Sequence, residues 1–354
     1  MTLLVEHRLS WTVARYLSGA YSGQIPASFQ KRLRAHREYR TRRALAHAAE
    51  LARLMKIFYA EGIFALSIKG PLLSLQLFGD VAARAGKDLD IFIKPQDIER
   101  AHKILWRESY RFAEHDASWT PKQIASYRRW SKDYAYVGLH NRVCIELHWR
   151  FFKNPHVFTL TEQGLEGCVV KTQVLGAAIC HFDWETNLIY LCCHGAVHTW
   201  TRLFWLVDIA TLMTKHTSVF DWNAVMDKAN TRDARRALLE GVVLAATLLG
   251  SPLPEPIEQA AKSDGALQWR LRTSLRKMEA LPRFDVVGGL ILARRTLKMH
   301  STSKHKIFSA TRYWHPSFED WDMVRLPDRF FGLYYVLRPF LATIRYCRRK
   351  WRRG

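Results

Sequence analysis

Apolar residues along the first third of the chain are arranged in two different patterns. From about residue 25 to 60, Leu, Ala and Phe recur three and four positions apart, which favours one long helix. The run IFALSI at 63–68 is typical of a short buried strand. A Lys-Gly-Pro turn follows, and its proline suits the first turn of a helix over PLLSLQLFG. The order helix, strand, turn and helix indicates the start of an α/β unit.

A second strand and helix follow in the same style. KDLDIFIKP, residues 87–95, predicts a strand that ends at its proline, and residues 96–110 predict a helix. DYAYVGL at 133–139 and RVCIELHW at 142–149 flank a His-Asn pair in the manner of two hairpin arms. We therefore expect a sheet built from these runs.

After about residue 185 the pattern is helical throughout. The apolar segment 185–216 is interrupted near 199–201, and the segment 234–250 ends at a glycine C-cap followed by Ser-Pro. The chain thus predicts an α/β core within a mainly helical protein. We expect four regions: a basic helical region at 1–60, the α/β core at 61–155, a mainly helical domain at 156–325, and a basic aromatic helix at 326–354.

Charge narrows the range of partners. The 354 residues include 54 Lys+Arg and 32 Asp+Glu, a net charge of +22, and 48% are hydrophobic, enough for a sizeable core. A field of this sign attracts polyanions: phosphates, nucleic acid or anionic lipid. One basic segment is KRLRAHREYRTRR at 31–43, for which a solvated helix face is the favoured interpretation and a polyanion contact the alternative.

The other basic segment is DRFFGLYYVLRPFLATIRYCRRKWRRG at 328–354. Its mixture of aromatic and cationic residues is typical of a helix that lies on an anionic membrane surface. A packed helix with a basic tail is the alternative, and nucleic acid is the less favoured partner. The residues concerned are Phe330, Phe331, Tyr334, Tyr335 and Trp351, with Arg338, Arg345, Arg348, Arg349, Lys350, Arg352 and Arg353.

Cysteine usage and the chain's apolar runs bear on location. The six cysteines form no CxxC pair and no zinc-knuckle spacing, so we expect reduced thiols. Glu6, His7 and Arg8 interrupt the stretch where a signal peptide would be apolar, and no run approaches the roughly 18 residues of a membrane span. We expect a cytoplasmic protein, with the C-terminal helix as its candidate peripheral contact with the inner membrane.

Acidic residues inside apolar strands are the strongest chemical signal. Asp88 and Asp90 stand two positions apart and share one face of a strand, while Leu89 and Ile91 point into the core. Glu146 lies in the second hairpin arm, again where an acid is costly without a partner. Three carboxylates at one sheet edge are hard-oxygen ligands for Mg²⁺, and two such ions can promote phosphoryl chemistry on a nucleoside triphosphate (NTP).

The Lys69-Gly70 turn fits the same chemistry. A helix N-terminus offers free N–H groups to a phosphate, Gly70 allows close approach, and Lys69 adds charge. Arg84, four residues before Asp88, can reach phosphate oxygens or hold a carboxylate. We therefore expect Lys69, Gly70 and Arg84 to contribute to nucleotide binding.

These residues resemble a known family. The order Lys-Gly, Leu-Phe-Gly, Arg84, DLDIFI, IERAHKIL and IELHWR, followed by HGAVHTWTRLFWLVDIATLM, is similar to the uncharacterised nucleotidyltransferase family of the DNA polymerase β-like superfamily. The resemblance covers about residues 55–215. It implies an α+β fold with a minimal nucleotidyltransferase mixed sheet and flanking helices, Mg²⁺, and transfer of a nucleoside monophosphate to an acceptor that is unassigned.

The resemblance carries over residue by residue. Asp88 and Asp90 match the metal-binding acid pair, Glu146 the third acid, and Lys69 with Gly70 the phosphate-binding turn. Two positions depart from the superfamily's pattern: Lys-Gly stands where Gly-Ser is usual, and Glu146 where Asp is frequent. An RNA 3′ end is an alternative acceptor that the charge would suit. A non-catalytic basic binding protein on a degenerate scaffold is the other alternative, and retention of all three acids argues against it.

Four further polar positions stand in apolar surroundings. His194 and His198 have helical i, i+4 spacing without the glutamate of an HExxH zinc site, so we interpret them as packed or hydrogen-bonded histidines, with a role facing the substrate as the alternative. Asp208 lies on an apolar helix, where a buried ion pair with Arg84 or Arg202 is favoured. His148 shares a strand face with Glu146, so it either orients an acceptor hydroxyl or makes a structural hydrogen bond.

Overall fold

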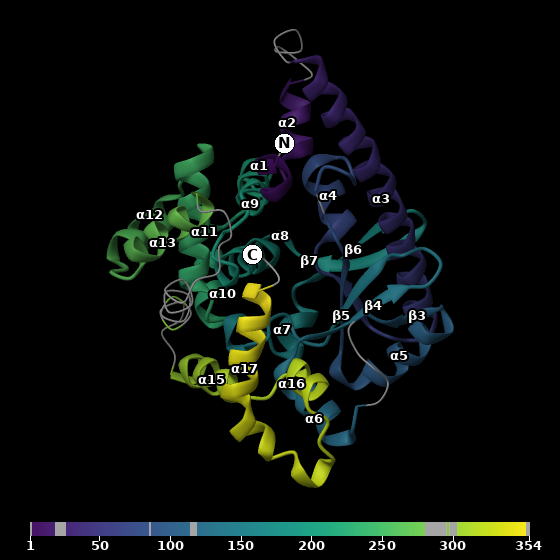
Figure 1. Ribbon diagram of the computed structural model, residues 1–354. Helices are drawn as coiled ribbons and strands as arrows, with labels where there is room; N and C mark the ends of the chain where they lie inside the picture. The colour runs from purple at the N-terminus through teal and green to yellow at the C-terminus, as the bar shows by residue number, and fades with distance from the viewer. Residues whose placement is uncertain are drawn as a thin grey trace.

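The protein is built around one mixed sheet (Figure 1). The computed structural model describes residues 2–17, 26–84, 86–113, 119–279, 295, 297 and 303–351. Within these residues the strands form a single 7-stranded sheet in the order β3-β4-β5-β2-β1-β7-β6. The strands are β1 (Ala65–Ser67), β2 (Leu89–Ile93), β3 (Tyr110–Phe112), β4 (Asp133–Gly138), β5 (Cys144–His148), β6 (Val169–Val174) and β7 (Ala177–Phe182).

The pairing of the strands mixes both directions. β1 is antiparallel to β2 and parallel to β7, and β2 is parallel to β5. The pairs β3–β4, β4–β5 and β6–β7 are antiparallel. The predicted α+β class with a mixed sheet is confirmed, and the predicted hairpin of two arms is the pair β4–β5.

Helices cover both faces of the sheet. The remaining elements are α1 (Thr2–Glu6), α2 (Ser10–Leu17), α3 (Ala27–Ala60), α4 (Gly70–Phe78), η2 (Pro95–Asp97), α5 (Ile98–Arg107), α6 (Pro121–Trp130), η3 (Pro155–Val157), α7 (Glu162–Glu166), α8 (Trp184–Val197), α9 (Phe204–Lys215), α10 (Trp222–Thr231), α11 (Arg235–Leu249), α12 (Glu255–Ser263), α13 (Leu267–Glu279), α15 (Ser303–Trp314), α16 (Phe318–Met323), η4 (Asp328–Phe330) and α17 (Leu333–Trp351).

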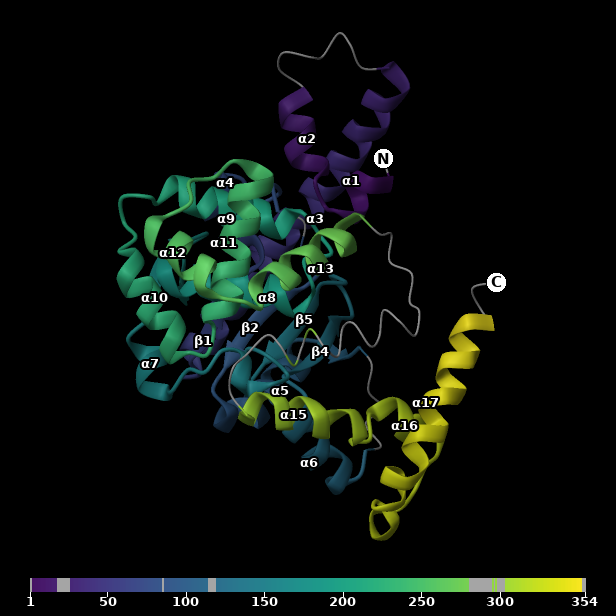
Figure 2. The same cartoon turned by 90° about the vertical axis from the view of Figure 1, so that its left-hand side faces the viewer.

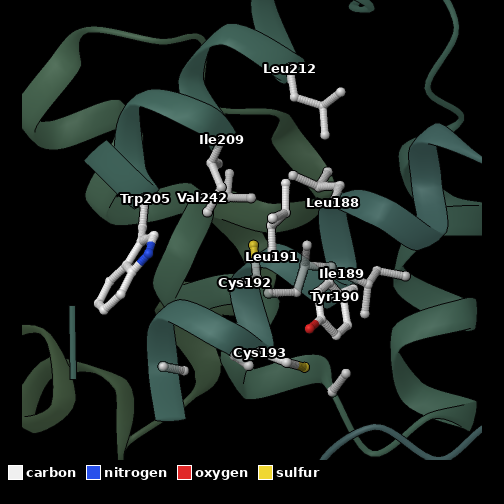
Figure 3. Close-up of a cluster of buried hydrophobic side chains, with 14 of the residues drawn as sticks. Leu188, Ile189, Tyr190, Leu191, Cys192, Cys193, Trp205, Ile209, Leu212 and Val242 are labelled. Atoms are coloured by element: carbon white, nitrogen blue, oxygen red, sulfur yellow. The ribbon is translucent and has the colours of Figure 1, made fainter. Parts of the chain in front are cut away.

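Two hydrophobic cores result from this layering. One lies between the sheet and helices α3 and α5, where Leu89, Ile91 and Ile93 meet Leu54 and Phe58. The other fills the space between the opposite face of the sheet and helices α8, α9 and α11. Figure 3 shows its centre, where α8 contributes six consecutive side chains that pack against Trp205, Ile209 and Leu212 of α9 and Val242 of α11. The middle of α8 is buried on every side, which explains why apolar residues occupy every side of it.

The predicted interruption near 199–201 separates α8 from α9. Thr199 and Trp200 both adopt left-handed backbone conformations, with φ of 56° and 52°. The indole of Trp200 is fully buried and folds back onto Gly195, where a Cβ would overlap the ring. Gly195, just over one turn earlier, leaves room for the Trp200 ring, so α8 can end here while the indole fills the core.

The hairpin β6–β7 does not appear among the elements predicted from the sequence. Leu175 and Gly176 join its strands, with φ of 51° and 68°, so both loop residues are left-handed. This is the geometry of a two-residue hairpin loop, which Asn-Gly or Asp-Gly usually signals. The sheet therefore continues beyond residue 155, into a stretch where the sequence pattern favoured helices.

Two other expectations concern the whole chain. None of the described helices combines the length and the apolarity that crossing a bilayer requires. All six cysteines are free: Cys168, Cys192 and Cys193 are buried, Cys144 and Cys180 are half-buried, and Cys347 is exposed.

Candidate active site

Asp90 and Glu146 are neighbours across the parallel pair β2–β5. The register places Asp90 opposite Glu146, so both side chains leave the same face of the sheet. His148 follows two residues later on β5 and shares that face. Oxygen or nitrogen atoms of these three side chains all lie within 4.8 Å of one another, which makes them a candidate metal-binding group.

Cations compensate the buried carboxylates of this group. Lys69 Nζ lies 2.9 Å from Asp90 Oδ1, and Lys132 Nζ lies 3.0 Å from Glu146 Oε2. His148 Nε2 lies 3.3 Å from each of these two carboxylates. Burial by itself raises the pKa of Asp90, but Lys69 and then His148 lower it well below its usual value. For Glu146, burial likewise raises the pKa, and His148 and Lys132 together lower it well below the usual range.

Asp88 stands at the rim of the same group. It is the residue immediately before β2 and is half-buried. Burial, followed by repulsion from Asp90 and Glu146, raises the pKa of Asp88 to about 6. The three acids predicted from the sequence therefore act on one another electrostatically, and Asp88 is the one least compensated by cations.

Sequence reasoning missed Lys132 and Asp133 as members of the site. Asp133 opens β4 and is paired in register with His148, whose Nε2 lies 3.9 Å from Asp133 Oδ2. Lys132 bridges the carboxylates of Asp133 and Glu146. Only the register between β4 and β5 brings this pair to the site, so no local motif could have revealed it.

The turn before α4 leaves its backbone open. Gly70 has φ of +75°, which favours glycine, and a Cβ there would meet no atom within 4 Å. Among the described residues no side chain caps the N-terminus of α4, so its first N–H groups have no side-chain partner there. The Lys69 ammonium is turned toward Asp90, so this lysine balances the acid group as well as adjoining the turn.

Arg84 is held by the buried acid of α9. Its Nε donates a hydrogen bond of 2.7 Å to Asp208 Oδ2, and both side chains are buried. The guanidinium also lies 5.2 Å from the centroid of the Phe204 ring. The predicted buried ion pair of Asp208 is confirmed, with Arg84 as the partner.

A known protein family matches the part of the chain that contains these residues. A sequence model of a family described as "Uncharacterised nucleotidyltransferase" matches residues 1–250. The chain belongs to this family. The matched region includes the whole described sheet and helices α1–α11, and it ends before α12–α17. No curated protein and no solved structure matches the chain.

The donor set of this family member fits a hard divalent cation. Oxygen ligands are what Mg²⁺ prefers, and Asp90 and Glu146 offer carboxylates at one point with His148 behind them. Neither ring nitrogen of His148 makes a hydrogen bond of ordinary geometry in the described part of the chain. The buried anions thus depend on nearby positive charge, which a metal ion would also provide.

His194 and His198 form an aromatic cluster next to the site. Their ring centroids are 4.7 Å apart, and Trp205 lies 5.3 Å from the first and 5.4 Å from the second. Burial, and then the charge of Lys69, lower the pKa of His194 well below its usual value. The side chain of His194 is half-buried and that of His198 is exposed, so the interpretation of a packed histidine suits His194 better than His198.

Proposed function

We propose that this nucleotidyltransferase moves a nucleoside monophosphate from an NTP to an acceptor, with Mg²⁺ as its cofactor. The observation that carries the proposal is the register pair Asp90 and Glu146, with Asp88 at the mouth of the same strand. Acids in the interior of a sheet are costly, and their convergence is the arrangement that phosphoryl transfer needs.

In this proposal Asp88, Asp90 and Glu146 would hold two Mg²⁺ ions. Bound there, the ions would neutralise triphosphate charge and make an acceptor hydroxyl more acidic. Lys69 and the open N-terminus of α4 lie on the β1 side of the acids and bind the phosphates. Glu146 lies on the β5 side, so we assign the acceptor to that side.

The proposed transfer exchanges one bond at phosphorus for another. The acceptor oxygen forms a bond to the α-phosphorus, and the bond from that phosphorus to the bridging oxygen of the β-phosphate breaks. Pyrophosphate departs with the electron pair, and the proton of the acceptor hydroxyl passes to solvent. The carboxylate of Glu146 orients that hydroxyl, and Lys132 fixes the carboxylate at 3.0 Å.

The test separates the candidate acceptors. The full-length protein is incubated with each NTP and Mg²⁺ together with lipid, RNA or protein fractions of a lysate, and each fraction is searched by mass spectrometry for an added nucleoside monophosphate. A mass shift that wild type produces and Asp90→Asn does not supports the proposal. A shift confined to RNA would assign the RNA 3′ end as acceptor, and no shift in any fraction with any NTP would contradict transfer.

We also propose that α17 attaches the enzyme to an anionic membrane surface. Four exposed apolar residues form one stripe along the helix: Leu333, Val336, Phe340 and Ile344. The opposite side of α17 packs against α16 and is anchored by the fully buried carboxylate of Asp320, which pairs with Arg338 and Arg345. Figure 2 shows α17 standing away from the sheet and its covering helices.

Charge at the end of this helix supports lipid as the partner. Arg348 is exposed, and the sequence continues with Arg349, Lys350, Arg352 and Arg353. Arg352 and Arg353 lie outside the described residues, as do the side chains of Arg349, Lys350 and Trp351. An apolar stripe that ends in a basic cluster matches the apolar interior and anionic headgroups of a bilayer surface.

A further inference from the structure

Helix α3 carries a row of two arginines and two histidines toward the Gly70 turn. His36, Arg40, Arg43 and His47 are spaced by four, three and four residues, so they occupy one side of the helix. Arg43 Nη2 donates a hydrogen bond of 2.6 Å to the carbonyl of Lys87, which ties α3 to the segment that precedes Asp88. The long N-terminal helix is therefore connected directly to the acid group.

Two hollows meet at Arg40. The first, between α3 and the α1–α2 pair, is lined by Arg8, His36, Arg37 and Arg40. The second is a small hollow lined by Arg40, Arg43, His47, Gly70 and Arg84. We call the two together the arginine groove, which runs along α3 and ends at the open backbone of Gly70.

The cations of the groove repel one another. Burial, and then the charges of Arg202 and Arg84, lower the pKa of Arg8 to about 10. Burial and the neighbouring Arg43 lower the pKa of Arg40 as well. Holding several guanidinium groups this close costs free energy, which an anion between them would return.

Two of the nearby acids are already engaged by other cations, because Asp208 is held by Arg84 and Asp90 by Lys69. The third, Asp88, attracts Arg8. In the described ranges Arg40 makes no ion pair with a carboxylate. His47 is only 4% exposed, lines the groove at its Gly70 end, and forms no hydrogen bond with another described residue. A buried imidazole without a partner among the described residues, beside Arg40, marks a place for an anion.

We propose that the arginine groove, through Arg40, Arg43 and His47, binds the β- and γ-phosphates of the nucleotide and holds pyrophosphate after transfer. This inference rests on the proposed function and names the part of the substrate that α3 recognises. It also accounts for the Lys-Gly turn, because a turn without the usual serine gains its phosphate ligands from a neighbouring helix. The family match begins at residue 1, so α3 lies within the matched region.

The shape of the groove favours a short anion over a nucleic acid backbone. Gly70, Pro71 and the buried side chain of Arg84 line its inner end, and the guanidinium of Arg84 is held by Asp208. A triphosphate is compact, highly charged and needs several convergent donors, which guanidinium groups supply in pairs. A strand of RNA would need a longer open surface with stacking side chains.

The experiment measures anion binding without catalysis. Full-length protein in EDTA is titrated with tripolyphosphate and with pyrophosphate by isothermal calorimetry. We expect Arg40→Gln to weaken both by roughly ten- to hundredfold, the usual value of a hydrogen bond to a charged group. Arg40→Lys should retain part of the affinity, because its charge remains but the planar fork is lost. Melting temperatures close to that of wild type would show that both variants are folded.

Arg42→Gln is the matched control. Arg42 is exposed on the same helix, roughly 200° around the axis from Arg40. Its substitution by Gln removes the same charge as Arg40→Gln does. Unchanged binding by this control together with weakened binding by Arg40→Gln supports the groove. Equal affinities of Arg40→Gln and wild type overturn it, and so does binding of an RNA oligonucleotide but not of tripolyphosphate. Wild-type protein that binds tripolyphosphate through Arg40 yet transfers no nucleotide would overturn the proposed function and leave the groove in place.

Discussion

Asp90 on β2 and Glu146 on β5 face each other across a parallel strand pair, and one histidine, His148, lies 3.3 Å from both carboxylates. The two acids therefore share their environment, although 56 positions separate them in the sequence. Lys69 compensates one and Lys132 the other. Any change at either acid alters the charge balance of the whole group.

Removing the negative charge of Asp90 or of Glu146 should strongly reduce transfer. We expect Asp90→Asn and Glu146→Gln each to lower Mg²⁺-dependent NTP turnover by more than about 100-fold, the upper end of what changes to mere supporting residues cost. Pyrophosphate release measured over a Mg²⁺ titration would show the loss. Glu162→Gln, a change at an exposed acid of α7, is the control and should keep wild-type turnover. Full turnover in both site variants would reject the assignment of these acids.

Asp88→Asn separates stability from activity. Burial and two neighbouring carboxylates raise the pKa of Asp88 to about 6, so its ionised form is unfavourable in the folded protein. At pH 7.5 without metal, the amide should stabilise the fold by roughly 1 kcal/mol or more, while NTP turnover is lost. Urea unfolding monitored by tryptophan fluorescence gives the free energy of unfolding. A variant that is less stable than wild type and fully active would contradict both the expected gain in stability and the expected loss of turnover.

The acids could be predicted because their signal is local. The i, i+2 spacing of Asp88 and Asp90, and an acid within the apolar run of Glu146, are visible in short windows of sequence. Lys132 and Asp133 carry no such signal, because their proximity depends on how β4 pairs with β5. Long-range register is set by the packed sheet and cannot be read from either strand alone.

The basic segment at 31–43 also shows that local sequence does not reveal tertiary packing. From sequence its arginines looked like one solvated face, and Arg32, Arg34, Arg37 and Arg42 are indeed exposed. Arg40 is half-buried because α1–α2, residues 81–84 and Gly86 lie over that side of α3. Helical spacing identifies the faces of a helix, and only tertiary packing decides which face is covered.

Away from the site, Glu240 holds two buried arginines together. Its carboxylate pairs with Arg270 and Arg295 and accepts a hydrogen bond of 2.7 Å from Ser274 Oγ, with Glu240 and Arg270 fully buried. Glu240→Ala should cost about 3–5 kcal/mol of unfolding free energy, because it leaves buried charges uncompensated. Glu258→Ala, which removes an exposed helix ion pair with Lys262, should cost roughly 0–1 kcal/mol. Similar losses in the two variants would show that the buried cluster is not stabilised by its carboxylate.

The same carboxylate should make stability depend on pH. Burial raises the pKa of Glu240, but Arg270 and Arg295 outweigh it and lower the pKa below the usual value of 4.5. A group with a depressed pKa contributes its stability above the unfolded-state value, and the contribution is lost as pH falls through the folded-state value. The difference in unfolding free energy between wild type and Glu240→Gln should therefore be constant from pH 8 to 5 and shrink below about 4.5. A difference that grows as the pH falls would show that folding raises the pKa of Glu240 instead of lowering it.

The last prediction concerns the apolar stripe of α17. Phe340 is 67% exposed, and Val336 and Ile344 extend its surface by one turn on either side. If these residues enter a bilayer surface, Phe340→Ser should weaken binding to anionic vesicles by roughly tenfold or more, the value of burying one aromatic side chain. Added salt should weaken binding of both proteins, because the basic end of the helix contacts lipid headgroups. Co-sedimentation with anionic and with zwitterionic vesicles measures both effects.

Tyr59→Ser provides the matched control, since Tyr59 is an exposed aromatic residue on α3, far along the chain from α17. Its vesicle binding should equal that of wild type. Salt alone cannot separate lipid from nucleic acid, because phosphate contacts of either kind weaken as salt rises. The aromatic substitution does separate them: loss of Phe340 should reduce binding to vesicles and leave binding of an RNA competitor unchanged. If full-length protein ignores anionic vesicles at low salt, the proposed attachment of α17 to a membrane surface is wrong.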